Sequence, residues 1–111
     1  MDCLFCRIVK GKLKSEVVHE NEGFLVIKDI HPQAPTHLLV IPKAHYPTLV
    51  DCADEGVLGR MLSTAVEAAR KYGFAESGFR TVINTNREGG QTVFHLHMHI
   101  LGGEPLSEKM V

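Results

Sequence analysis

Three histidines alternate with apolar residues near the end of the chain, in the stretch VFHLHMHIL at residues 93–101. Imidazole titrates near neutral pH, so it serves as a nucleophile, a general acid or base, or a metal ligand. Successive side chains of a β-strand point to opposite faces, which predicts that His95, His97 and His99 form a row on one face. The opposite, apolar face would carry Phe94, Leu96, Met98 and Ile100. The pattern alone leaves three interpretations open: a polar strand face, a zinc site or a catalytic site.

The segment NTNREGGQT, residues 84–92, precedes this row and contains two adjacent glycines. Glycine allows the backbone to approach a ligand closely and to curve around an anion. Backbone N–H groups, together with the side chains of Gln91 and Thr92, are therefore candidate donors to phosphate oxygens. Joined to three histidines, the segment indicates phosphorus chemistry.

Composition limits the classes of protein to consider. The chain has 111 residues, 44% of them hydrophobic, and a net charge of −1, which predicts one domain over residues 1–111. Basic residues are dispersed, so we expect no nucleic-acid partner. The first residues lack the pattern of an export signal and no stretch is apolar enough to span a membrane, so we expect a cytoplasmic protein with no membrane partner. Three cysteines argue against a disulfide framework, and Cys52 is expected to pack in the core.

The first half of the chain predicts a short helix followed by strands. Apolar spacing favours a helix over residues 4–11 that ends at a glycine. Two β-rich runs around a turn predict a hairpin of residues 16–20 and 24–29. After a proline-containing loop, residues 37–42 are apolar enough for a central strand.

The second half predicts one long helix and two strands. Residues 51–73 carry an apolar stripe at helical spacing, with Asp51 or Asp54 as the cap. The stripe consists of Leu58, Met61, Leu62, Ala65, Val66, Ala69 and Tyr72. Residues 79–86 and 92–101 alternate as strands do. The predicted fold class is α+β: a five-stranded antiparallel sheet with one long helix and a short N-terminal helix.

The stretch HLHMHIL matches the H-φ-H-φ-H-φ-φ signature of the histidine triad (HIT) superfamily. The chain resembles its Hint branch of nucleotide-binding phosphoramidases, through DIHPQAPTHLLVIPK (29–43) and NTNREGGQTVFHLHMHILGG (84–103). The resemblance implies a HIT-like fold, a homodimer whose two sheets join, a purine nucleotide substrate of the AMP type, and no organic cofactor. The implied reaction is hydrolysis of adenosine 5′-phosphoramidates or aminoacyl-type adenylates through a covalent nucleotidyl-histidine.

The resemblance also implies residue roles. His97 would be the nucleophile, His99 would bind phosphate, and His37 would orient the other histidines. Phosphate contacts would come from Asn84 and from Gly90, Gln91 and Thr92. The ribose would contact Asp29 and Ile30, and the purine would lie against Phe5, Ile8, Leu13 and Ile27.

Cys3 and Cys6 form a C-x-x-C pair. A redox pair would be expected beside a βαβ unit, which this chain does not show. Half of a tetrahedral zinc site and a pair of small buried residues are the other two interpretations. The resemblance favours structural zinc, with Cys3, Cys6, His45 and His95 as its ligands.

Two further functions remain as alternatives. A dinucleoside polyphosphate hydrolase of the Fhit-like branch would use the same nucleophile on an anhydride. A non-enzymatic nucleotide-binding or zinc-binding interaction module would bind nucleotide without turnover. Comparing the two substrate classes tests the first, and nucleotide binding that survives loss of His97 tests the second.

Overall fold

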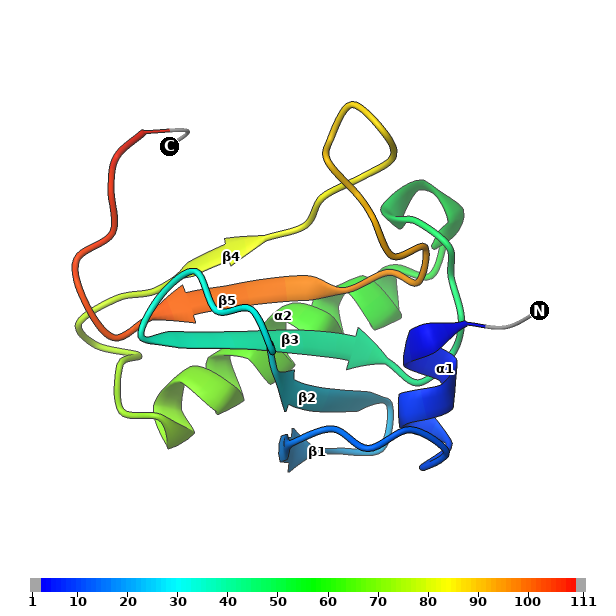
Figure 1. The fold of residues 1–111 in the computed structure, drawn as a ribbon, viewed down its shortest axis with the longest axis horizontal. Helices are drawn as coiled ribbons and strands as arrows, with labels where there is room; N and C mark the ends of the chain where they lie inside the picture. The colour runs from blue at the N-terminus through cyan, green and yellow to red at the C-terminus, as the bar shows by residue number, and fades with distance from the viewer. Residues whose placement is uncertain (1–2, 110–111) are drawn as a thin grey trace.

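The computed structural model describes residues 3–109, which form a five-stranded antiparallel sheet with a long helix on one face and a short helix on the other (Figure 1). The elements in chain order are α1 (Leu4–Val9), β1 (Val17–Glu20), β2 (Phe24–Lys28), β3 (Thr36–Pro42), the 3-10 turn η1 (Leu49–Asp51), α2 (Glu55–Lys71), β4 (Arg80–Val82) and β5 (Met98–Gly102). The predicted α+β class is confirmed. No helix within residues 3–109 is long and apolar enough to cross a membrane.

The strand order is β1-β2-β3-β5-β4, which places β3 at the centre. β3 is buried from His37 to Pro42 because packed side chains cover both of its faces. In the antiparallel register Leu39 lies opposite His99 and His37 lies opposite Leu101. Side chains that face each other across a ladder share a face, so His37 and His99 are diagonal neighbours on one side of the sheet.

Helix α2 packs its small residues on the other side of the sheet. Asp54 caps it by accepting from the N–H groups of Gly56 and Val57. The buried face consists of Met61, Thr64, Ala65, Ala68 and Ala69, and it covers Phe24, Val26, Leu38, Val40, Met98, Ile100 and Cys52. The predicted apolar stripe is thus partly wrong, because Leu62 is 54% exposed while alanines and the hydrogen-bonded Thr64 face the sheet. Small side chains allow the closest approach of helix and sheet.

The helix also starts later than the sequence predicts. Asp51 does not cap it, because its carboxylate accepts from the backbone and hydroxyl of Thr48 and closes the turn η1 instead. α2 therefore begins at Glu55 and not at residue 51.

The opposite face of the sheet carries a smaller apolar cluster of Phe5, Leu25, Ile27, Leu39 and Ile41. Phe5 belongs to α1, which lies beside the end of β3 (Figure 1). Ile8 and Val9 of the same helix pack against this cluster. The helix covers only part of this face, and the remainder lines a cavity above β3 and β5.

The prediction of a strand over residues 92–101 is wrong in its first half, since β5 begins only at Met98. The β3–β5 ladder ends at the pair Val40–Met98. Beyond it, the carbonyl of Pro42 accepts a bond from the ring of His95, and the N–H of Leu96 donates to Tyr46 at 2.6 Å. These bonds replace the ladder, so Phe94 is 47% exposed and does not join the apolar face. β4 is also shorter than the predicted residues 79–86. It spans only Arg80–Val82, because the last pair of its ladder with β5 joins Val82 to His99, next to the first residue of β5.

Candidate active site and metal centre

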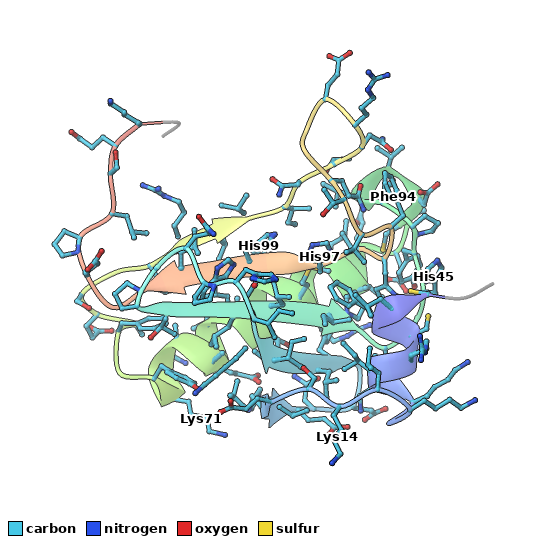
Figure 2. All side chains as sticks on the ribbon, viewed as in Figure 1. Lys14, His45, Lys71, Phe94, His97 and His99 are labelled. Atoms are coloured by element: carbon cyan, nitrogen blue, oxygen red, sulfur yellow. The ribbon has the colours of Figure 1, made fainter. Side chains whose placement is uncertain are left out.

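His97 immediately precedes β5, and its ring lines the cavity beside His99 (Figure 2). Its Nδ1–H donates to the backbone carbonyl of His95 at 2.8 Å. A neutral imidazole carries a single proton, so this bond leaves the lone pair on Nε2. Burial lowers the pKa of His97 more than this hydrogen bond and Asp29 raise it. At neutral pH His97 is therefore an uncharged imidazole with an unprotonated Nε2, the form that attacks electrophiles.

His37 and His99 form a second hydrogen-bonded unit on the same face. The backbone N–H of Gln33 donates to Nδ1 of His37 at 3.0 Å, and Nε2 of His37 lies 2.8 Å from Nδ1 of His99. Burial lowers the pKa of His37, against the charge of Asp29. Burial, with the charges of His97 and His37, lowers the pKa of His99 to about 4. Both rings are thus neutral near pH 7.

Asp29 follows β2 and points one carboxylate oxygen at this unit. Its Oδ1 accepts from the N–H of His31 at 2.7 Å, and its Oδ2 lies 3.4 Å from Nε2 of His37. The side chain is 17% exposed and lines the cavity. A carboxylate with one oxygen anchored to its own loop can accept hydrogen bonds from a ligand through the other.

The cavity has a volume of about 570 Å³, which suits a nucleotide-sized ligand. One part of its wall is apolar and the other carries the histidines and the loop of residues 84–92. It brings together every residue for which the resemblance implies a nucleotide contact: Phe5, Ile8, Leu13, Ile27, Asp29, Ile30, Asn84, Gly90, Gln91, Thr92, His37, His97 and His99. Ile30 is 84% exposed at its rim.

The loop of residues 84–92 is held by Gln91, whose side chain has a different role from the predicted one. Its Oε1 accepts from the N–H of Asn86, and its Nε2 donates to the carbonyls of Pro47 and Val93. The backbone N–H groups of Gly90 and Gln91 are also bonded within the loop. Gln91 is buried and its amide is engaged, so the expected donation from this side chain to phosphate is corrected to a positioning role.

The side chains of Asn84 and Thr92, by contrast, make no hydrogen bond within residues 3–109, although both line the cavity. Their amide and hydroxyl groups can therefore donate to a ligand. With His97 and His99, they are the polar groups of this wall that remain available.

A separate cluster of two cysteines and two histidines lies at the start of α1. One potential ligand atom of each side chain lies within 4.8 Å of the others in Cys3, Cys6, His45 and His95. Nδ1 of His95 lies 3.3 Å from Sγ of Cys3, 3.6 Å from Sγ of Cys6 and 3.1 Å from Nδ1 of His45, which is 3.3 Å from Sγ of Cys6. Ligand atoms around tetrahedral zinc are about 3.3–3.8 Å apart, given bonds of 2.0–2.3 Å. The three nitrogen–sulfur distances lie in this range and the nitrogen–nitrogen distance of 3.1 Å is slightly shorter, so the four side chains are close to the arrangement of a Cys₂His₂ zinc site.

The backbone fixes the orientation of the His95 ring. Its Nε2–H donates to the carbonyl of Pro42 at 2.8 Å, so Nδ1 presents its lone pair to the two sulfurs. The ring is fully buried, and burial lowers the pKa of His95. Nε2 of His45 has no such partner within residues 3–109. The backbone therefore holds the ring of His95 more firmly than that of His45.

Two features of the site were not predicted from the sequence. The first is the backbone N–H of Gln33, which no pattern of side chains reveals. The second is Leu39, which lines the cavity on β3 and could have been found from its alternation with His37.

Comparisons with known proteins agree with this geometry. The model of the HIT domain matches residues 10–106. A purine nucleoside phosphoramidase of Escherichia coli strain K12 is 44% identical over 107 residues, covering 95% of this chain and 90% of that protein.

Solved structures are also similar. A HIT family hydrolase from Legionella pneumophila Philadelphia 1 superposes with a TM-score of 0.92 at 44% identity, covering 96% of this chain and 97% of that one. A Zn-bound histidine triad family protein from Mycobacterium smegmatis superposes with a TM-score of 0.81 at 37% identity, covering 97% of this chain and 79% of that one.

Proposed function

The chain belongs to the HIT domain family, and from this premise we propose that it is a purine nucleoside phosphoramidase that hydrolyses adenosine 5′-phosphoramidates or aminoacyl-type adenylates. The observation that carries the proposal is the 2.8 Å contact between Nδ1 of His97 and the carbonyl of His95, because a carbonyl only accepts and the proton must lie on Nδ1, which leaves Nε2 unprotonated in a cavity of nucleotide size. The reaction proceeds in two displacements at phosphorus.

In the first displacement Nε2 of His97 attacks the α-phosphorus, and the bond from phosphorus to the amine breaks. Positive charge develops on the imidazole, and the carbonyl of His95 stabilises it by accepting from Nδ1–H. The departing amine takes up a proton from solvent water as this bond breaks. In the second displacement water hydrolyses the nucleotidyl-histidine and restores the free imidazole.

Charge on the phosphoryl oxygens is stabilised by neutral donors. His99 accepts at Nδ1 from His37 and so carries its proton on Nε2, and Asn84 and Thr92 contribute an amide and a hydroxyl. Such preorganised donors around a developing charge are typically the largest electrostatic contribution to catalysis.

The nucleoside occupies the apolar part of the cavity. Oδ2 of Asp29 accepts from the ribose hydroxyls, since Oδ1 is already bonded to the loop. Ile30 packs on the ribose from the rim, and the purine lies against Phe5, Ile8, Leu13 and Ile27.

Zinc at Cys3, Cys6, His45 and His95 is part of the proposal as a structural cofactor, supported by the ligand distances and the backbone orientation of His95. Bound there, it would tie the start of α1 to the segment that precedes β5. Its effect on the reaction is indirect, through the backbone of His95, whose carbonyl holds His97.

We also propose a homodimer in the cytoplasm. Within residues 3–109 the edge strand β4 pairs with β5 and with no other strand, so its outer edge is free to pair with a second copy of the chain. The three free cysteines among the described residues are consistent with a reducing compartment.

The proposed activity is tested by turnover of adenosine 5′-phosphoramidate with the parent protein, His97→Ala and His19→Ala. His19 pairs with Glu67 away from the cavity and is the matched control. We expect turnover and a trapped nucleotidyl adduct in the parent and the control, and neither in His97→Ala. Equal rates in His97→Ala and the parent refute the proposal. Faster turnover of dinucleoside polyphosphates favours the Fhit-like alternative, and nucleotide binding without turnover favours the interaction module.

A further inference from the structure

The backbone of the loop between β2 and β3 contacts the ring of His37. Pro32 and Pro35 flank the turn, Gln33 donates its backbone N–H to Nδ1 of His37, and its side chain bonds the carbonyl of His31 at 3.2 Å. His37 is 6% exposed, so this N–H reaches a buried ring nitrogen. The ring is thereby contacted from the loop on one side and from β5 on the other.

The positions of the protons follow from this contact. A nitrogen that accepts from an N–H group carries no proton, so neutral His37 has its proton on Nε2. That nitrogen faces Nδ1 of His99 at 2.8 Å, which must accept. Neutral His99 then has its own proton on Nε2. One backbone donor thus determines which nitrogen carries the proton in both rings.

We propose that the backbone N–H of Gln33 is the positioning group that fixes the protons of His37 and His99, so that His99 presents an N–H, and not a lone pair, to an anionic group in the cavity. The proposal rests on the proposed function only for the identity of that anion, a phosphoryl group.

The same contact distinguishes this unit from a metal site. Asp29, His37 and His99 also place three ligand atoms within 4.8 Å of one another, as the zinc-site residues do. A histidine ligand normally donates its outer N–H to a carbonyl, which leaves the inner nitrogen free for the metal. His95 has that arrangement, whereas the outer nitrogen of His37 accepts and its inner nitrogen is protonated. The inner nitrogen of His37 therefore cannot ligate a cation.

The contact also disfavours an additional proton on the pair. If Nδ1 of His37 took up a proton, two N–H groups, its own and that of Gln33, would face each other and the hydrogen bond would be lost. A proton on Nδ1 of His99 would likewise face the N–H of His37. The other titratable groups nearby are His97, whose charge would repel an additional proton, and Asp29, which favours one. The lowered pKa values of His37 and His99 agree with a pair that stays neutral.

The test compares Gln33→Pro with Gln33→Ala. Proline removes the N–H from an exposed loop position that lies outside the strands, while alanine keeps the N–H and removes only the side-chain bond to His31. Nitrogen-15 NMR of the histidine rings reports which nitrogen is protonated, and it needs no substrate. Zinc-loaded protein is used, so that the Cys₂His₂ site is filled.

In the parent and Gln33→Ala we expect unprotonated Nδ1 and protonated Nε2 on both His37 and His99. In Gln33→Pro we expect a raised pKa of His37 and uptake of a proton on its Nδ1, with the acid limb of kcat/KM moved to higher pH. Added Zn²⁺ should leave the His37 and His99 signals unchanged in the parent.

A protonated Nδ1 on His37 in the parent overturns the proposal, as does a Gln33→Pro titration identical to that of Gln33→Ala, or binding of added Zn²⁺ at these rings. If Gln33→Pro does not fold, the spectra of the parent and Gln33→Ala still decide. Expected spectra without phosphoramidate turnover would refute the proposed function and leave this inference standing.

Discussion

Gly89 lies in the loop that precedes the histidines, and its replacement by alanine should separate loop geometry from stability. A Cβ at this position would lie 2.3 Å from the backbone oxygen and 2.8 Å from the backbone nitrogen of Thr85. Real Cβ atoms essentially never approach closer than 3.0 Å, so the two segments must separate by roughly 0.7 Å. Backbone atoms cannot rotate away as the end of a side chain does. The displacement therefore moves Asn84 as well, because Asn84 directly precedes Thr85 in the chain.

A displacement of this size is large for catalysis. Misplacing reacting groups by about 1 Å can cost about 100-fold in rate, so we expect kcat/KM to fall by about 100-fold in Gly89→Ala. That loss corresponds to about 2.7 kcal/mol of transition-state stabilisation. The free energy of unfolding should change little, because residues 86–90 are exposed and lie outside both apolar clusters.

The assay is steady-state turnover of adenosine 5′-phosphoramidate, with thermal unfolding of the same samples. Glu88→Ala is the matched control, since Glu88 is exposed in the same loop and its side chain does not line the cavity. An unchanged kcat/KM in Gly89→Ala would refute the proposal that this loop positions groups that bind the phosphate. An equal loss in Glu88→Ala would show that the effect does not come from the contact with Thr85.

Two further predictions concern acid and zinc. His99 stays neutral in the folded protein down to about pH 4, whereas the unfolded chain takes up this proton near pH 6.5, so acid favours the unfolded chain. Urea unfolding should show stability falling from about pH 6.5 to pH 4, less steeply in His99→Asn; equal slopes would contradict the burial of a neutral ring. Chelation should lower the melting temperature of the parent by roughly 10 °C, if zinc is present at about 100 times its Kd, and leave Cys6→Ser unchanged. A parent that contains no zinc and is insensitive to the chelator would contradict the zinc site.

The sequence was sufficient for the fold class, because periodicity reports which face of an element is buried. The sequence was a less reliable guide to strand boundaries, where other hydrogen bonds take the place of strand pairing. Residues 92–97 alternate as a strand does, but bonds from a ring nitrogen to Pro42 and from Leu96 to Tyr46 take the place of strand pairing. Phe94 is exposed for this reason. Alternation of residue types cannot report such bonds.

The site shows the same limit at the level of single residues. Gln91 could be placed in the loop from sequence, yet its amide closes the loop internally and is not free to bind a ligand. The identities of Asn84 and Thr92 gave no sign that they, and not Gln91, remain available. Which polar group is free depends on three-dimensional hydrogen bonding, and spacing along the chain does not determine it.

The backbone assigns the histidines their different chemistry. A carbonyl that accepts from Nε2 leaves His95 with a lone pair on Nδ1, directed at two sulfurs, whereas a carbonyl that accepts from Nδ1 leaves His97 with a lone pair on Nε2. A backbone N–H at Nδ1 has the opposite effect on His37, because it fixes a proton on the inner nitrogen. The proposed metal ligand, nucleophile and hydrogen-bond donor are thus all histidines. Substitutions that move the backbone beside these rings should therefore change which ring nitrogen carries the proton, even when every histidine is kept.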